Sequence, residues 1–518
     1  MFSLKKLQDI NQLKAGAVLS YMVLGLNSIV GIAYTPYMLR MMGQSEFGLY
    51  SLVGSVVAYL TIMDFGIGNA IIRYTSKFRA ENKVEEQYSM FGMFLILYTI
   101  IGCFAFLLGL GLYFNVELIF GNSLTLEEIR KAEIMIMLMN FNVAFTFPLS
   151  IFTSIILAYE KFVFQKGIQI LRIILNTVAM ILILELGYRA IGMVVVITIF
   201  NLSTLLSNLW FSYYKIKIKI YFSKFDYSLL KEILIYSSFI FLNIIVDRVY
   251  WSTGQFVLGA FVGTAAIAVF AVAIQLQQLY MGFSTAISSV FLPKVTAMIT
   301  TMNSEKSISD LFIRTGRIQF IVISFILSGF ILFGKPFIVL WAGPDYIDAY
   351  IISLLFFIPL AIPLIQNLGI VILQARNQMK FRSFLYIGIA FFSLSLQIPL
   401  AKSFGAIGSA IGISVALILG QVIVMNIYYH KKQNIDIIKF WKEIFGMAIA
   451  PVILCLIAYY LTSEFMVGTL IDLTLGIILF SLAYTIVLWF FCMNNYEKNM
   501  ITKPVLSLYN NIHYKFYI

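Results

Sequence analysis

Fourteen apolar stretches, each about the length that crosses a lipid bilayer, constrain this 518-residue chain more than any other feature. A helix that crosses the hydrocarbon core needs about 20 mainly apolar residues. Only 12% of the residues are charged, whereas a soluble globular chain carries about 25%. The sequence therefore predicts an all-α polytopic membrane protein without a sizeable soluble domain. The expected spans are 15–39, 47–72, 89–114, 133–158, 169–187, 191–213, 233–259, 264–292, 317–340, 350–374, 383–402, 408–428, 443–462 and 469–492.

Lysine and arginine are distributed unevenly between the segments that connect these spans. Arg317, Lys335 and Lys402, which lie toward the ends of their spans, are counted with the adjoining segments. With the N-terminus inside, the cytoplasmic segments then hold 28 of the 36 basic residues, the outer segments six and the spans two. Cytoplasmic loops of membrane proteins carry such an excess. We therefore expect both termini in the cytoplasm. The net charge of +12 follows from this topology and does not indicate nucleic-acid binding. The polar start, 1–14, does not fit a cleaved signal peptide, so we expect the first span to remain.

The chain also repeats itself with an offset of about 215 to 220 residues. Six spans make up this offset, so both copies start on the same side and form parallel repeats. We predict two six-helix lobes, 1–225 and 226–440, related by a pseudo-two-fold axis along the membrane normal. Residues 441–518 would add two further helices and a cytoplasmic tail. The matched segments are Gly43 with Gly263, Pro148-Leu149 with Pro363-Leu364, Lys161-Phe162 with Lys380-Phe381, Ala190-Ile-Gly192 with Ala406-Ile-Gly408, and Tyr213-Tyr214 with Tyr428-Tyr429.

The seventh span, 233–259, carries Asp247 and Arg248 near its middle. A charge at the bilayer centre costs from about 3 to more than 10 kcal/mol unless it is relieved. On a helical projection, Asn243, Trp251 and Gln255 fall on the same half of the circumference as these charges. This helix is expected to have one dry face and one face that meets water, a partner or a polar ligand. We interpret the polar face as part of a transport pathway.

Two motifs near the N-terminus resemble a known family. They are Pro36-Tyr-Met-Leu-Arg-Met-Met-Gly-Gln-Ser-Glu-Phe-Gly-Leu-Tyr50 and Asp64-Phe-Gly-Ile-Gly-Asn-Ala-Ile-Ile-Arg73. Both are similar to the polysaccharide-transporter branch of the multidrug/oligosaccharidyl-lipid/polysaccharide exporter superfamily, in particular to O-antigen and capsule-repeat flippases. The resemblance implies a flippase of the bacterial plasma (inner) membrane. Its cargo would be an undecaprenyl-pyrophosphate-linked oligosaccharide, and its partners a glycan polymerase and a chain-length regulator.

Such a cargo needs cations for its diphosphate and polar groups for its sugars. Arg248 is the best-placed cation, since a guanidinium can grip phosphate oxygens in a bidentate fork. Arg172 and Arg73 lie at the inner ends of spans five and two, where they either meet the head group or anchor the helices by snorkelling. Alternating access would be driven by an H⁺ or Na⁺ gradient. The remaining candidates are Trp251, Asn27, Asn243 and Gln255 for the sugar, and Asp247 and Asp64 for ion coupling.

Each of these assignments has a structural alternative. Asp247 and Arg248 would equally neutralise charges on neighbouring helices. Asp64 lies in a glycine-rich part of span two, where close packing would bury it against a hydroxyl or a basic side chain. Three scattered cysteines and two histidines indicate no disulfide framework or metal site. We expect no cofactor and no catalytic group, and no phosphate-cradling loop for ATP is present.

Three other functions remain open at this stage. A membrane glycan polymerase would need catalytic groups in a large outer loop, and the longest one here, 115–132, has about eighteen residues. A multidrug exporter of the same superfamily would not need cations for a diphosphate. A flippase for the peptidoglycan lipid precursor is expected to carry arginines within its first two spans, and none precedes Arg73 within them.

Overall fold

Every regular element in the described part of the chain is a helix. The computed structural model describes residues 12–222, 226–289, 291, 295, 297–299, 305–376, 378–464, 468–500 and 502. The helices are α1 Gln12–Met42, α2 Gln44–Leu60, η2 Thr61–Asp64, α3 Ile67–Ala80, α4 Val84–Phe114, α5 Val116–Phe120, α6 Leu126–Ala158, α7 Phe162–Glu185, α8 Ala190–Phe211, η3 Ser212–Ile216, α9 Tyr227–Phe261, α10 Thr264–Ser289, α12 Glu305–Trp341, η4 Pro344–Tyr346, α13 Asp348–Ile365, α14 Leu368–Ala375, α15 Lys380–Leu417, η5 Ile418–Val424, α16 Met425–Gln433, α17 Ile437–Glu464, α18 Leu470–Val487 and η6 Leu488–Cys492.

Twelve helical segments of the described residues are long and apolar enough to cross a membrane. Eleven of them correspond to one predicted span each, while Lys380–Gln433 contains both 383–402 and 408–428. Two helices meet inside this segment, where Phe404 (φ −130°) and Gly405 (φ 57°) leave the helical conformation. α9 holds the remaining span, 233–259. The protein is therefore a multi-pass membrane protein, and its helices are consistent with fourteen spans.

The chain divides into two compact units, Met1–Ala271 with Ala390–Ser409, and Val272–Ile389 with Ala410–Ile518. The division falls inside α10 and inside α15. These units are defined by packing, whereas the predicted lobes, 1–225 and 226–440, are defined by the duplication. The lobes and the appended segment 441–518 stay predictions.

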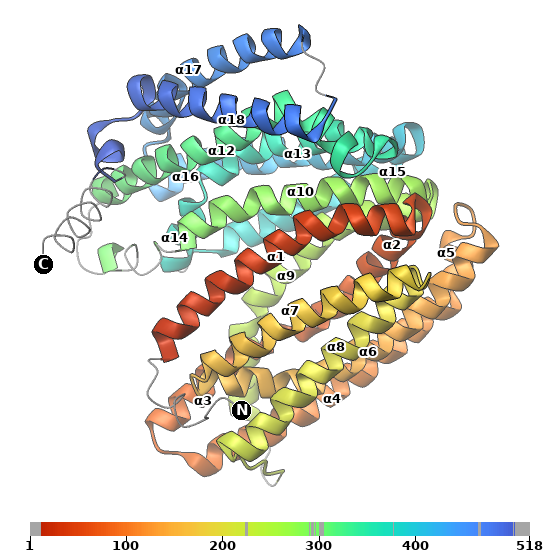
Figure 1. Cartoon of the computed structure of the whole chain (residues 1–518). Helices are drawn as coiled ribbons and strands as arrows, with labels where there is room; N and C mark the ends of the chain where they lie inside the picture. The colour runs from red at the N-terminus through yellow and green to blue at the C-terminus, as the bar shows by residue number, and fades with distance from the viewer. Residues whose placement is uncertain are drawn as a thin grey trace, which may run out of the picture. The chain divides into compact units, whose positions relative to one another are not determined.

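Helices of the first unit approach one another closely. α4, α6 and α8 lie side by side, and α1 packs against α7 (Figure 1). A Cβ atom on Gly102 of α4 would stand 2.6 Å from the carbonyl oxygen of Ala144 in α6. Lipid gives helices no hydrophobic reason to associate, so membrane bundles depend on this kind of small-residue packing. The largest side chains at the centre of the unit are aromatic, among them Phe91, Phe94 and Tyr98 of α4.

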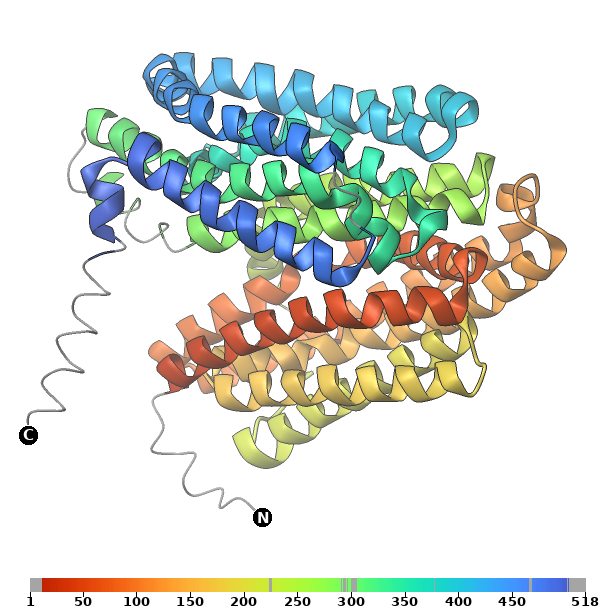
Figure 2. The same ribbon diagram turned by 45° about the horizontal axis from the view of Figure 1, so that its top comes forward.

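In the second unit, α12 packs against α13 and against the two C-terminal helices α17 and α18 (Figures 1 and 2). An ion-pair cluster supports this arrangement. Nε of Arg317 on α12 lies 2.6 Å from Oε1 of Glu497, and Nη1 lies 2.7 Å from Oε2 of Glu443 on α17. The Arg317 side chain is 9% exposed and that of Glu497 2%. Arg317 of α12 thus forms a buried ion pair with Glu497, in the segment after η6, and a partly exposed one with Glu443 of α17.

Matched positions of the predicted duplication have matching local structure. Gly43 (φ 77°) precedes α2, and Gly263 (φ 127°) precedes α10. Gly187 (φ 83°) and Gly405 (φ 57°) also come shortly before helices, α8 and the second half of α15, but they are not one of the matched pairs. A positive φ favours glycine because a side chain clashes with the backbone there. The positive φ at both Gly43 and Gly263 agrees with the predicted duplication, which stays a prediction.

Candidate functional site

The second predicted span is broken near its middle. The 3₁₀ turn η2 and the residues Phe65 and Gly66 separate α2 from α3, and both residues have left-handed backbone (φ 52° and 70°). For a phenylalanine this conformation costs about 1–3 kcal/mol. The Phe65 ring packs on Phe241 of α9, with centroids 4.5 Å apart. Non-helical backbone at membrane depth is tolerated only inside protein or at a water-filled cavity. The break is therefore a candidate functional element.

Asp64 lies at the end of η2 and is half-buried. Its Oδ1 accepts a hydrogen bond of 2.8 Å from the hydroxyl of Tyr98 on α4, which is itself fully buried. A Cβ atom on Gly68 would meet Ser154 Oγ at 3.3 Å and the Tyr98 hydroxyl at 3.9 Å, so this glycine leaves room beside the pair. Ionisable residues inside the membrane are costly and mark functional sites more often than not. Of the two partners expected for Asp64, the structure provides the hydroxyl.

α9 packs against α2, α3 and the break. The hydroxyls of Tyr59 on α2 and Thr253 on α9 are 2.6 Å apart. Arg248 is exposed, while Trp251 and Gln255 are half-buried. The side chains of Asn243 and Asp247 lie outside the part of the molecule that the structure describes. The break at Asp64 and the helix that carries Arg248 are thus neighbours.

The other predicted ligands are more dispersed. Arg73 of α3 is exposed and stands 5.7 Å from the centroid of the Tyr74 ring. Arg172 of α7 is half-buried, and Asn27 of α1 is exposed. None of the three lines either of the cavities described below. Their roles in cargo binding stay predictions, as do those of Arg248, Asn243, Trp251 and Gln255.

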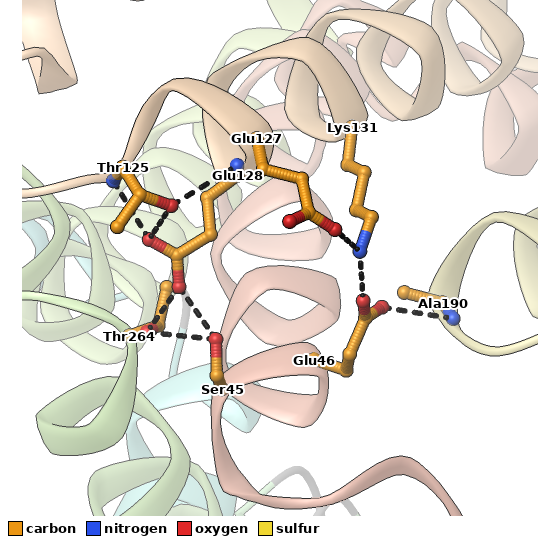
Figure 3. Close-up of polar contacts among 8 residues, drawn as sticks. All are labelled: Ser45, Glu46, Thr125, Glu127, Glu128, Lys131, Ala190 and Thr264. Carbon is orange, nitrogen blue, oxygen red and sulfur yellow. Dashed lines mark hydrogen bonds and ion pairs between the residues drawn. The ribbon is translucent and has the colours of Figure 1, made fainter.

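Sequence analysis did not predict a polar cluster at the start of α6, which we call the Glu128 cluster. Its members are Ser45, Glu46, Thr125, Glu127, Glu128, Lys131, Ala190 and Thr264 (Figure 3). Thr125 caps α6 and forms a capping box with Glu128. Oε1 of Glu128 accepts hydrogen bonds from the hydroxyls of Ser45 (2.5 Å) and Thr264 (2.8 Å). One carboxylate therefore joins the starts of three helices.

Lys131 forms the second half of this cluster. Its Nζ lies 2.5 Å from Oε1 of Glu46 and 2.7 Å from Oε1 of Glu127. The backbone N–H of Ala190, at the start of α8, donates to the other oxygen of Glu46 at 3.4 Å. A cavity of about 410 Å³ opens beside these groups, and Arg189 is also in its lining. The one sequence signal was Thr125 followed three residues later by Glu128, a pattern that marks a helix start.

A second cavity, of about 560 Å³, lies at the start of α4. Its lining contains charged groups of both signs: Lys83, Glu85, Glu86 and Asp226. The segment before α9 crosses α4 there, and the N–H of Tyr221 donates to the carbonyl oxygen of Tyr88 at 3.1 Å. A Cβ atom on Gly92 would lie only 2.0 Å from the carbonyl oxygen of Tyr221. This contact holds the segment that leads into α9 against α4.

Solved structures define the class of fold. The chain superposes on the lipid II flippase MurJ in an inward closed conformation with a TM-score of 0.71, at 17% identity, over 95% of this chain and 99% of that one. An inward-facing multidrug resistance MATE family transporter of the MOP superfamily gives a TM-score of 0.60 at 14% identity, over 80% of this chain and 99% of that one. The chain therefore has the fold that these two transporters share.

The family follows from the sequence itself. Residues 13–299, more than half of the chain, match the family described as Polysaccharide biosynthesis protein. The protein belongs to this family, and the resemblance found in the two N-terminal motifs is confirmed. A protein of Salmonella typhimurium named "Putative O-antigen transporter" is 31% identical over 72 residues. That match spans 14% of this chain and 17% of the relative.

Proposed function

We propose that the protein is a flippase that moves undecaprenyl-pyrophosphate-linked oligosaccharide repeat units across the bacterial plasma membrane. The observation that carries this proposal is the family match over residues 13–299. The likeness to flippase and exporter folds supports it, and the charge distribution favours cytoplasmic termini. A glycan polymerase and a chain-length regulator would act on the exported units.

The cargo explains why polar groups lie on spanning helices. A diphosphate and a hydroxyl-rich head cannot cross hydrocarbon unaided, while the polyprenyl tail never needs to leave it. Arg248, exposed on α9, is the proposed diphosphate ligand, with Arg73 and Arg172 at the cytoplasmic entrance. Trp251 and Gln255, one and two turns further along α9, would contact the sugars, together with Asn243 and Asn27.

The cycle that we propose is alternating access driven by an ion gradient. Asp64 is the better supported coupling group, because it lies at a helix break and has a hydroxyl partner. Binding of H⁺ or Na⁺ at this carboxylate would change its hydrogen bond to Tyr98. That change would act directly on the contact between η2 and α4. Asp247 is the alternative coupling group.

Complementation tests the cargo class. The gene is introduced into a strain that lacks its own repeat-unit flippase, and surface glycan is measured per molecule of inserted protein. We expect export to be restored, and Arg248→Ala to lower it about tenfold or more, because a charged hydrogen bond to phosphate is lost. Arg130→Ala, at an exposed arginine of α6, is the matched control.

The alternatives give different results in the same strain. Resistance to toxic cations without surface glycan would identify a drug exporter. Growth of cells depleted of their peptidoglycan-precursor flippase, without any surface glycan, would indicate that the protein carries the peptidoglycan lipid precursor. Normal glycan display with Arg248→Ala would remove this arginine from the site.

A further inference from the structure

Two turns that the duplication makes equivalent are in direct contact. Gly43 leads into α2 and Gly263 leads into α10, both with positive φ. The hydroxyls of Ser45 and Thr264, just after these glycines, are 3.3 Å apart. A Cβ atom on Gly48 would stand 1.9 Å from the carbonyl oxygen of Thr264, so only glycine allows α2 and α10 to approach this closely.

Glu128 of α6 reinforces that contact. Its Oε1 accepts from Thr264 at 2.8 Å and from Ser45 at 2.5 Å, so it lies between the two equivalent turns (Figure 3). Close by, the hydroxyl of Ser123 donates to the carbonyl oxygen of Gly259, at the end of α9. α2 and α6 belong to the predicted lobe 1–225, while α9 and the start of α10 belong to 226–440.

The neighbouring ion pair has a different character. Lys131 and Glu46 join α6 to α2, and Glu46 accepts from the backbone of α8. All three helices belong to the first predicted lobe. Glu127 is exposed and pairs with Lys131. The cluster therefore has one half that fixes helices within a lobe and one half that links the two lobes.

We propose that Glu128 is a latch that closes the outer side of the transporter, and that its hydrogen bond to Thr264 breaks each time this side opens. The inference rests on the proposed alternating access and on cytoplasmic termini, which place the cluster outside. When hydrogen bonds between hydroxyls and a carboxylate break, water takes over both partners, so the net cost of opening is far below the strength of the bonds in a dry environment. A latch of this kind is reversible, whereas the close packing at Gly48 gives the closed state a defined geometry.

Cysteine labelling measures opening without any cargo. Thr253 of α9 is 5% exposed and bonded to Tyr59 of α2. Thr253→Cys, in a chain whose Cys103, Cys455 and Cys492 are replaced by serine, should react slowly with an impermeant maleimide added outside. We expect Glu128→Gln to raise this rate about tenfold, because the charge-assisted bond to Thr264 becomes a weaker neutral one.

Glu127→Gln is the matched control, since it removes the same charge one residue away and should leave the rate unchanged. Equal labelling in the two variants would overturn the proposal. Because labelling needs no glycan, a chain that fails to export repeat units still tests the latch, and the two proposals fail separately.

Cross-linking provides a second test that does not depend on Glu128. Ser45→Cys with Thr264→Cys places two thiols where the hydroxyls are 3.3 Å apart. Oxidation should abolish both the labelling of Thr253→Cys and glycan export, and reduction should restore them. If the fully cross-linked protein is labelled as fast as the protein with free thiols, α2 and α10 do not separate during opening. That result would also overturn the proposal.

Discussion

At the scale of single residues, Asp64 combines a carboxylate inside the membrane with a strained backbone beside it. Its carboxylate is in a spanning segment and accepts a hydrogen bond of 2.8 Å from the Tyr98 hydroxyl. Phe65, beside it, has a left-handed backbone that is held in place by packing on Phe241. Strain of this kind persists only where the surroundings impose it, and it gathers at functional sites.

The substitution Asp64→Asn separates the two roles of this residue. The amide oxygen can still accept the hydrogen bond from Tyr98, so the fold should be kept. The side chain can no longer bind H⁺ or Na⁺ by charge, so export of glycan per inserted molecule should fall about tenfold or more. Tyr98→Phe, which keeps the charge and removes the bond, should reduce export less.

Surface glycan and inserted protein are measured together for these variants. Wild-type export in Asp64→Asn, with a loss of inserted protein in Tyr98→Phe, would show that the pair is structural. The coupling role would then pass to Asp247.

At the residue scale, the sequence carries local signals, and the role of Asp64 in ion coupling stays a prediction. Asp64 was singled out from its charge and its glycine neighbours, and it does lie at a special point of the backbone. Glu128 was missed because its partners Ser45 and Thr264 are 83 and 136 residues away. A capping pattern indicates where a helix starts, but it does not indicate which other helices will share the carboxylate.

At the scale of helices, composition predicted the spans but not their interruptions. The stretch 47–72 reads as one continuous apolar run, although α2 and α3 are separated by η2. Likewise 350–374 contains both α13 and α14. Freed backbone groups need tertiary partners: the hydroxyl of Ser284 donates to the carbonyl oxygen of Leu364 at 2.7 Å. Hydropathy carries no information about such partners.

The Arg317 cluster gives a prediction at the same scale. Arg317→Ala leaves Glu497 buried without its main partner, which costs about 3–5 kcal/mol. Detergent-solubilised protein should therefore unfold at a clearly lower temperature, with α17 and α18 loosened from α12. Lys439→Ala is the control, because the side chains of its pair with Asp310 are 50% and 38% exposed. Such surface pairs contribute about 0–1 kcal/mol.

The thermal unfolding midpoints of these two variants decide the point. Equal midpoints would mean that the C-terminal helices are held by apolar packing, and that the buried charges contribute little. Replacing Arg317 together with Glu497 should recover part of the loss, because no buried charge is then left alone.

At the scale of the whole molecule, the sequence was most informative about class. The membrane class followed from long apolar runs and a low charge content, and the family followed from the two N-terminal motifs. The identity of the glycan could not be predicted from the sequence, because sugar specificity depends on side chains around a cavity and these follow no regular sequence pattern. The duplication was predicted from short segments that recur at one offset, such as Gly43 with Gly263, and it stays a prediction.

Flipping by purified protein tests the central claim most directly. The protein is reconstituted into liposomes that contain a fluorescent polyprenyl-diphosphate-linked oligosaccharide, and an impermeant quencher of the head group is added outside. With an imposed pH or Na⁺ gradient, we expect quenching to extend beyond the outer-leaflet population for the wild type, and not for Arg248→Ala. Quenching by the wild type that equals protein-free liposomes under both gradients would contradict the account.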